Sequence, residues 1–313
     1  MKKGRSITVS APAKVHLLGE WSAVWGKPAI LTAIDLRLRV TISQGRTVPS
    51  ELLKLQKLIE KIVKKELKLK KIPLYSLEIS SDIPVGSGLG SSAAVSSAYI
   101  GALLSYLRVN WDLNLIYKLT YEAEKIFAGS PSGGDQSPII YGKLIWFRKE
   151  DNDLKLIHPL PFSIPQKLSR NFVLINSGKP AEATAEIIAQ VKTTFAKKPG
   201  VLNSFLEDQE KLVKELLIVI KEGSQKEFMR IIKQGQRNLE SIGVVPKSIF
   251  PVITRIERSG GVVKIIGAGG KKGAAGMLLA YHPNKAKLLK IVKSFNLPYL
   301  SPTLGVEGVR KEL

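Results

Sequence analysis

The sequence predicts an α+β fold arranged in two domains. Segments with strand and helix patterns interleave in both halves of the chain, which is typical of such a fold. A length of 313 residues is enough for two hydrophobic cores of ordinary size. A polar segment at residues 150–170, containing three prolines, is predicted to be the junction between them. We therefore expect an N-terminal domain at residues 1–160 and a C-terminal domain at residues 161–313.

The first part of the N-terminal half is predicted from periodicity and from turn-forming residues. Alternating apolar and polar residues indicate strands, and leucine or isoleucine at helical spacing among lysines indicates an amphipathic helix. The expected elements are a short strand at Val15–Leu18, a loop at Gly19–Lys27, a return strand from Ala29 that leads into Arg37–Ser43, a helix from Ser50 to about Leu67, and a strand at Leu74–Ser80.

A glycine-rich loop that opens into a buried helix is the most informative stretch, at Asp82–Leu107. Pro84 ends the preceding strand, and Gly86, Gly88 and Gly90 allow sharp turns with unobstructed N–H groups. Unpaired N–H groups at a helix start favour phosphate, and the serine hydroxyls that follow could bind phosphate or magnesium. The loop lacks the Lys-Ser/Thr pair of a Walker loop and the later acidic residue of a dinucleotide site. A glycine turn capped by serine is the ordinary alternative.

A second loop, Gly129–Ser137, follows a helix predicted from Asp112 to about Phe127. Glu122 and Glu124 lie near the end of that helix, and a strand is expected at Tyr141–Arg148. Asp135 lies in the loop, where an aspartate is usually a turn residue. If the loop faces the phosphate site, however, Asp135 is the carboxylate that phosphoryl transfer to an alcohol requires.

The C-terminal half is expected to contain strands, four consecutive helices and another glycine-rich loop. In order, the predicted elements are a strand at Phe172–Asn176, helices at Ala183–Phe195, Val201–Glu222, Gln225–Ile242 and Lys247–Ser259, a strand at Val262–Ile266, the loop Gly267–Gly276, a strand at Met277–Tyr281, a helix at Asn284–Ser294 and a short terminal strand.

Composition limits the class of protein. The formal net charge of +22 would attract anionic ligands such as nucleotides, but its ordinary explanation is solvated lysine-rich helices. We expect no specific nucleic-acid binding, because no motif or aromatic interleaving supports it. The chain has no cysteine, no apolar stretch long enough to span a membrane and no apolar segment near its start typical of a signal peptide. These features favour a cytoplasmic protein.

Three segments, in order, resemble the three signature motifs of the GHMP kinases. They are A-P-A-K-V-H-L-L-G-E at 11–20, P-V-G-S-G-L-G-S-S-A-A at 84–94 and K-I-I-G-A-G-G-K-K-G-A-A-G at 264–276. Within this superfamily the glutamate-bearing helix followed by P-S-G-G-D-Q is most similar to mevalonate kinases. The resemblance implies a ribosomal protein S5 domain 2-like N-terminal domain and a ferredoxin-like C-terminal domain, with the active site in the cleft between them.

The resemblance also implies roles for individual residues. Asp135 would be the catalytic aspartate, with Lys14 paired to it and to the transferred phosphate. ATP and Mg²⁺ are the implied cofactors, with Glu124 and one of Ser91 and Ser92 holding the metal. Substrate contacts are expected from Glu20, Trp21, Thr184 and Gly269. The residues expected to bind the nucleotide are Pro84, Gly86, Ser87, Gly88, Leu89, Gly90, Ser91, Ser92 and Ala93. The third glycine-rich segment is expected to pack beside this loop and to close the nucleotide site.

Trp21 is the main departure from the family pattern, because mevalonate kinases usually carry histidine after Gly-Glu at this position. The expected reaction is phosphorylation of the primary hydroxyl of mevalonate, and the alternative is a relative acting on phosphomevalonate or a sugar. A nucleotide-binding regulator without catalysis is a third possibility, which the joint presence of Lys14, Glu124 and Asp135 argues against. A homodimer is left open.

Overall fold

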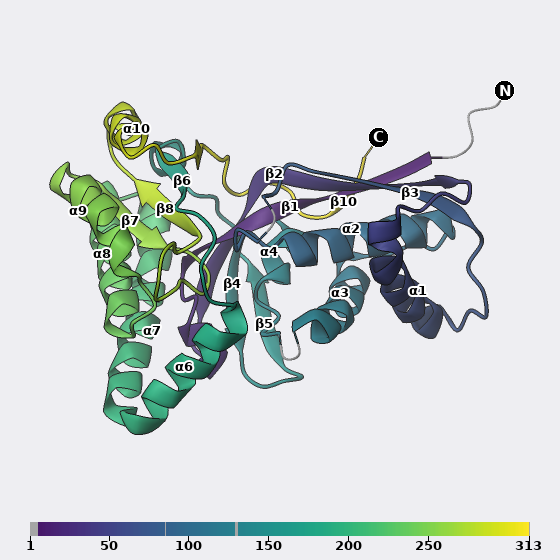
Figure 1. Cartoon of the computed structure of the whole chain (residues 1–313), viewed down its shortest axis with the longest axis horizontal. Helices are drawn as coiled ribbons and strands as arrows, with labels where there is room; N and C mark the ends of the chain where they lie inside the picture. The colour runs from purple at the N-terminus through teal and green to yellow at the C-terminus, as the bar shows by residue number, and fades with distance from the viewer. Residues whose placement is uncertain (1–5, 85, 129–130, 313) are drawn as a thin grey trace.

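The computed structural model describes residues 6–84, 86–128 and 131–312, without the side chains of residues 127, 128, 184 and 185. It contains two antiparallel sheets and the helices packed on them (Figure 1). Among the described residues, no helix combines the length and the apolar character that crossing a membrane would need.

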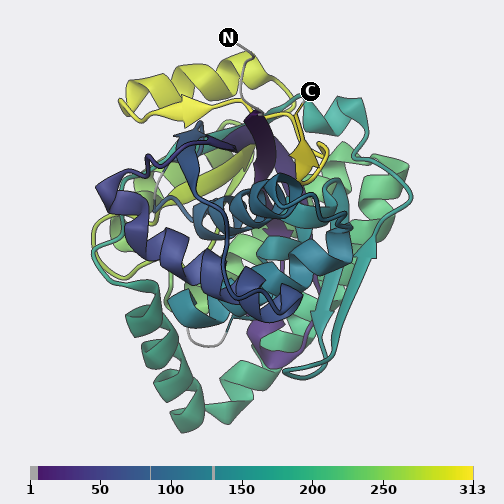
Figure 2. The ribbon, with the colours of Figure 1, turned by 90° about the vertical axis from the view of Figure 1, so that its right-hand side faces the viewer.

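The first sheet has the strand order β10-β1-β2-β4-β5, with β3 also paired to β2. Its helices lie on one face, and Figure 2, seen from the end that carries α1, shows α1, α2 and α3 side by side against it. The elements of this half are β1 (Ser6–Leu18), η1 (Ser22–Trp25), β2 (Ala29–Gln44), η2 (Ser50–Leu52), α1 (Leu53–Leu67), β3 (Tyr75–Ser81), α2 (Ser91–Tyr106), α3 (Leu113–Ala128), α4 (Gln136–Tyr141), β4 (Leu144–Lys149) and β5 (Lys155–Pro159).

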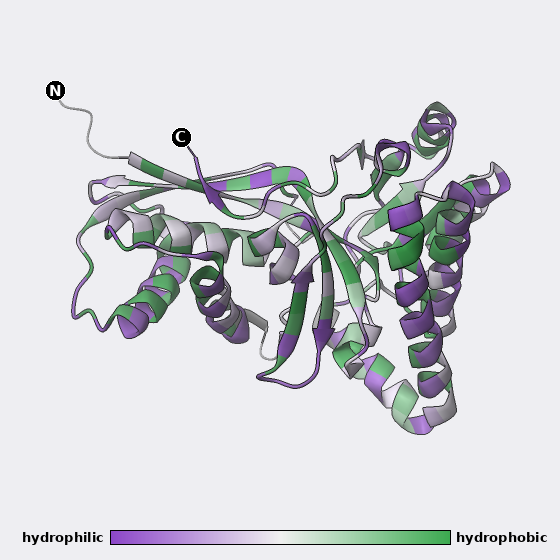
Figure 3. Cartoon of the chain, turned by 180° about the vertical axis from the view of Figure 1, so that it is seen from behind, coloured by the Kyte–Doolittle hydropathy of each residue, from purple (hydrophilic) through white to green (hydrophobic). Residues whose placement is uncertain are grey.

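The second sheet has the strand order β7-β8-β6-β9. Its core includes apolar side chains from α6, α8 and α9, and the long helices at the right of Figure 3 show hydrophilic residues on the side seen there. The elements of the C-terminal half are α5 (Gln166–Ser169), β6 (Phe172–Asn176), α6 (Thr184–Lys197), α7 (Pro199–Glu222), α8 (Gln225–Ser241), η3 (Lys247–Ile249), α9 (Phe250–Arg258), β7 (Val262–Ile265), β8 (Met277–Tyr281), α10 (Lys285–Ser294) and β9 (Tyr299–Leu300). The final strand, β10 (Arg310–Lys311), returns to the first sheet and pairs with β1.

Helix α2 is buried on nearly every side, as its uncharged small-residue sequence predicts. Its alanines, serines and glycine allow close approach to β1 and β2, and a Cβ added at Gly101 would lie 3.1 Å from Val9 Cγ1. This packing fixes the start of α2, and the glycine loop before it, against the first sheet.

Three expectations about elements need correction. Strand β1 begins at Ser6 rather than at Val15, and its Pro12 is tolerated because the register shifts between Pro12 and Ala13. The segment taken as the domain junction contains β5, which pairs with β4 at the sheet edge. The second loop ends at Asp135, because α4 begins at Gln136. The division at residues 160 and 161 stays a proposal, and β10 crosses it.

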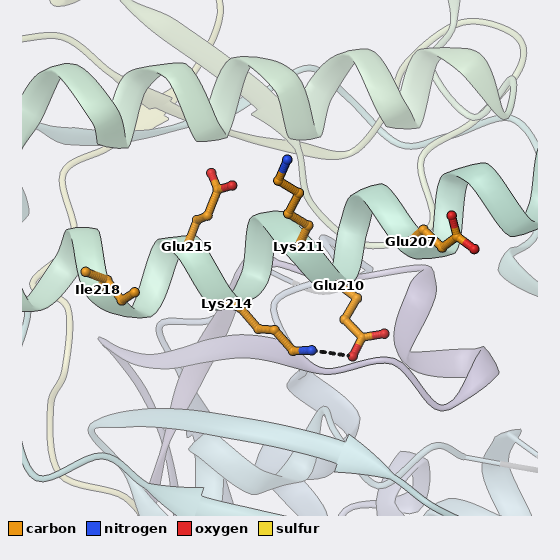
Figure 4. Close-up of a pocket in the computed structure, with 6 residues that line it drawn as sticks. All are labelled: Glu207, Glu210, Lys211, Lys214, Glu215 and Ile218. Atoms are coloured by element: carbon orange, nitrogen blue, oxygen red, sulfur yellow. Dashed lines mark ion pairs between the residues drawn. The ribbon is translucent and has the colours of Figure 1, made fainter.

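A shallow hollow of about 470 Å³ lies along α7 and is lined by residues of that helix alone (Figure 4). Glu210 forms an ion pair with Lys214 there and another with Lys27, which follows η1, at 2.8 and 2.5 Å. The Lys27–Glu210 pair therefore joins the loop after β1 to the helical layer of the C-terminal half.

Candidate active site

The site is built around an ion pair between Lys14 and Asp135. Lys14 lies in β1, with its side chain only 3% exposed, and its Nζ is 2.9 Å from Asp135 Oδ1. Asp135 lies immediately before α4, and its side chain is 57% exposed. The sheet thus holds a buried ammonium beside a carboxylate that is open to solvent and to a ligand.

The Asp135 carboxylate is held in its ionised form. Desolvation of the carboxylate opposes ionisation, but the charge of Lys14 and the hydrogen bond from Lys14 together keep the pKa of Asp135 below its ordinary value. A carboxylate with a lowered pKa is a good hydrogen-bond acceptor for a substrate hydroxyl and a weak base for removing its proton early.

The glycine loop lies directly against Lys14. Gly86, Gly88 and Gly90 all have positive φ, at 71°, 78° and 83°, which is the left-handed region that glycine adopts without strain. The Lys14 N–H donates to the carbonyl of Leu89, and a Cβ at Gly90 would lie 3.0 Å from Lys14 Cγ. The start of α2, with Ser91, Ser92 and buried Ala93, therefore stands next to the ion pair.

The third glycine-rich segment packs beside this loop, as expected from the sequence. A Cβ added at Gly267 would lie 4.0 Å from the Cα of Gly88, and one at Gly276 would lie 3.8 Å from the Ser87 carbonyl oxygen. Gly269 instead faces Val244, because its added Cβ would lie 2.1 Å from the Val244 oxygen. The segment from the C-terminal half thus covers one side of the glycine loop.

Glu124 and Ser92 come together at the start of α2. Ser92 Oγ donates to Glu124 Oε1 at 2.7 Å, and Ser96 Oγ lies 3.5 Å from the same oxygen. Burial raises the pKa of Glu124, the Ser92 hydrogen bond acts in the opposite direction, and the nearby charge of Asp135 raises the pKa further. Of the two candidate serines, Ser92 is the one whose contact with Glu124 is seen in the described part of the chain.

Glu20 and Trp21 lie in buried surroundings between the two halves. Glu20 forms an ion pair with Lys264 of β7, and the two side chains are 3% and 0% exposed. Trp21 is also 3% exposed and stacks on Trp25, with ring centroids 6.4 Å apart, within the core of the C-terminal half. Its indole N–H has no hydrogen-bond partner among the described residues.

Two residues of the site were not predicted from the sequence, and one predicted residue cannot be placed in it. His16, whose Nε2 lies 3.7 Å from Asp135 Oδ1, and Lys264 gave no signal beyond their positions inside two of the motifs. Thr184 is the first residue of α6, but its side chain lies outside the described residues. Pro84 precedes the loop, and its carbonyl accepts a hydrogen bond from Ser87 Oγ at 2.7 Å.

Comparisons with known proteins show which family the chain resembles. Residues 54–143 match the family described as GHMP kinases N terminal domain. The mevalonate kinase of Archaeoglobus fulgidus is 33% identical over 269 residues, which cover 83% of this chain and 88% of that protein. The mevalonate kinase of Pyrococcus furiosus is 30% identical, with 90% of each chain covered. The crystal structure of Methanococcus jannaschii mevalonate kinase superimposes with a TM-score of 0.79 at 21% identity, covering 100% of this chain and 99% of that one.

Proposed function

The chain belongs to the GHMP kinase family, as an ATP-dependent small-molecule kinase, and we propose that its substrate is mevalonate. The reaction would transfer the terminal phosphoryl group of ATP to the primary hydroxyl, giving 5-phosphomevalonate for isoprenoid synthesis. The observation that carries the proposal is the 2.9 Å contact between Lys14 and Asp135 beside the glycine loop, in a chain 33% identical to a mevalonate kinase.

The nucleotide phosphates are proposed to bind at the loop from Pro84 to Gly90 and the start of α2. Support comes from the three glycines with positive φ and from the N–H groups at the first turn of α2, which favour anions. Lys14 would contribute its charge to the phosphoryl group that moves.

Magnesium is proposed to bind at Glu124 and Ser92. The donor set fits this ion, because both residues offer hard oxygens and Mg²⁺ completes its coordination with water and substrate phosphates. No group of three or more histidine, cysteine or acidic side chains suited to holding a metal occurs in the described ranges. When bound, the ion would neutralise charge on the phosphates.

Asp135 is proposed to orient the substrate alcohol. Its ionised carboxylate would accept a hydrogen bond from the hydroxyl, whose oxygen forms the new bond to phosphorus as the bond to the β-phosphate oxygen of ADP breaks. The hydroxyl proton would pass to Asp135 late in this step, once bonding to phosphorus has made it acidic. A lowered pKa of Asp135 suits such late transfer.

A relative of the same reaction class that acts on phosphomevalonate or a sugar is the second candidate. The observation that favours it is Trp21 at a position where mevalonate kinases usually carry histidine, together with the basic charge of the chain, which suits a phosphorylated substrate. A cytoplasmic location, a homodimer and the lack of nucleic-acid binding stay predictions.

The test is an assay of ADP release with magnesium-ATP and four acceptors: mevalonate, phosphomevalonate, homoserine and galactose. We expect turnover with mevalonate and little with the others, and we expect Asp135→Ala to abolish it. Preferred turnover with phosphomevalonate or galactose would contradict the proposed substrate and would leave the kinase assignment in place.

A further inference from the structure

His16 lies next to the Lys14–Asp135 pair and has no role in the function proposed above. Residues two apart on a strand point to the same face, so Lys14 and His16 of β1 both face this site. The register between β1 and β2 shifts between Pro12 and Ala13 and again between His16 and Leu18. Such irregularities reorient side chains and occur often beside active sites. The two side chains thus lie on a short stretch bounded by irregular pairing on both sides.

The two ring nitrogens of His16 lie close to the two members of the Lys14–Asp135 ion pair. Lys14 Nζ is 3.3 Å from His16 Nδ1, and His16 Nε2 is 3.7 Å from the Asp135 Oδ1 that also contacts Lys14. Because an ammonium group only donates, it must donate to an unprotonated Nδ1, which places the imidazole proton on Nε2. The 3.7 Å distance is too long for a hydrogen bond, so the contact with Lys14 is the one that defines the position of the imidazole.

Burial and the surrounding charges keep His16 neutral. Lys14 and Asp135 form one ion pair, and Lys264 and Glu20 form a second that lies close enough to influence His16. Burial, then the charge of Lys14, with a smaller contribution from Lys264, lowers the pKa of His16 to about 3, although Asp135 acts in the opposite direction. A protonated imidazole would place a second positive charge beside the Lys14 ammonium, on a side chain that is only 8% exposed and next to a carboxylate already paired with Lys14. Neutral His16 therefore remains an acceptor at neutral pH.

We propose that His16 is a positioning residue for Lys14, whose ammonium donates one hydrogen to His16 Nδ1 and a second to Asp135, which leaves the third for the phosphoryl group. The proposal rests on the proposed function for the last of these contacts. An ammonium at the end of a flexible four-carbon stem has three rotatable donors, and two fixed acceptors limit that freedom. The Lys14 stem lies against Gly90, and His16 and Asp135 together constrain the ammonium at its tip.

The kinetic test compares His16→Leu, which removes the acceptor, with His16→Asn, whose side-chain oxygen can replace Nδ1 as an acceptor. We expect His16→Leu to lower kcat by about tenfold to a hundredfold, as loss of a group that orients a catalytic residue does, with KM for mevalonate changed little. His16→Asn should recover most of the activity. Wild-type kcat in His16→Leu, or equal impairment in both variants, would overturn the proposal.

His282→Leu is the matched control for the loss of a buried histidine. His282 is 5% exposed, lies beside the start of α10 and contacts the Ser259 carbonyl and the Asn284 N–H at 3.0 and 2.8 Å. The His282→Leu variant is expected to have lower stability and unchanged kcat. A fall in kcat equal to that of His16→Leu would show that general damage explains both and would overturn the positioning role.

A spectroscopic test separates this proposal from the proposed function. The chain has three histidines, so ¹⁵N spectra of the imidazoles can be assigned to His16 by comparing wild type with His16→Asn. At pH 7 we expect the neutral Nε2–H form, with an Nδ1 signal that shifts in Lys14→Met. A protonated Nδ1, or an Nδ1 signal unaffected by Lys14→Met, would overturn the positioning role. If the wild type does not turn over mevalonate, the proposed substrate fails, and these spectra still decide the role of His16.

Discussion

Replacing Glu20 by glutamine is expected to destabilise the protein strongly, because it leaves the buried Lys264 without its partner. The two side chains are 3% and 0% exposed, and their contact joins the first motif to β7 of the other sheet. Removing one member of a buried ion pair typically costs about 3–5 kcal/mol of unfolding free energy, a large part of the total for most proteins. Glu20→Gln and Lys264→Met should each lose about this much.

The double variant Glu20→Gln/Lys264→Met should lose clearly less than the sum of the single losses, because neither charge is then left alone. Urea unfolding followed by tryptophan fluorescence measures all four free energies, with Trp21 and Trp25 close to the pair. Losses of unfolding free energy below about 1 kcal/mol in both single variants, or a loss in the double variant equal to the sum of the single losses, would refute the Glu20–Lys264 pair as the cause of the destabilisation.

The pH dependence of stability gives a second test of the buried Lys264. Burial, and the nearby charge of Lys14, lowers the pKa of Lys264 well below its ordinary value of 10.5. The folded wild type therefore binds fewer protons than the unfolded state at any pH between the lowered pKa and 10.5, so Lys264 makes the stability rise with pH in that window. Lys264→Met lacks this group, so we expect its stability to rise less between pH 7 and pH 9 than that of the wild type, and an equal or larger rise would contradict this reasoning.

Three further predictions follow from the site and from the ion pairs of Glu210 on α7. Ser92→Ala should raise the Mg²⁺ concentration needed for half-maximal turnover by about tenfold, because the proposed site loses the Ser92 oxygen and Glu124 loses a hydrogen bond that orients it; an unchanged Mg²⁺ titration would exclude this site. Gly90→Ala should cost about 1–3 kcal/mol in urea unfolding, since its φ is 83° and the new Cβ would lie 2.7 Å from Ile139 Cδ1; a stable variant would show that the loop can rearrange. The pKa of Glu210 is lowered to about 2 by hydrogen bonds from two lysines, so its contribution to folding stability, about 1 kcal/mol or less, should be present above pH 4.5 and lost as the pH falls toward 2. Comparing the stability of wild type and Glu210→Gln at pH 6 and pH 3 tests this, and a difference that grows in acid would contradict it.

The local parts of the site could be predicted from the sequence because local chemistry determines them. Glycines between a proline and a small-residue helix require positive φ and close packing, and the structure has both. The third glycine-rich segment was expected beside the second, and the distances from Gly267 and Gly276 confirm this. The family membership that the motifs indicate is confirmed by the comparisons.

The remaining features depend on contacts between residues far apart in the chain. Glu20 and Lys264 are separated by 244 positions, and nothing near either residue indicates the other. Strand β1 was predicted too short because Pro12 normally argues against a strand interior, whereas a shift in register accommodates it. Strand β5 lies within a polar, proline-containing segment and forms by pairing with β4 at the sheet edge. His16 became informative only when the fold placed the Lys14–Asp135 ion pair beside it.

The most direct test of the central claim is the single-turnover rate of phosphoryl transfer from magnesium-ATP to mevalonate in Asp135→Asn, measured together with the dissociation constant for ATP. Asparagine preserves the size of the side chain and removes the charge that pairs with Lys14. We predict that the rate falls by about a hundredfold or more and that ATP still binds. A rate within threefold of wild type would contradict the account, because it would show that the carboxylate beside Lys14 does not take part in the transfer.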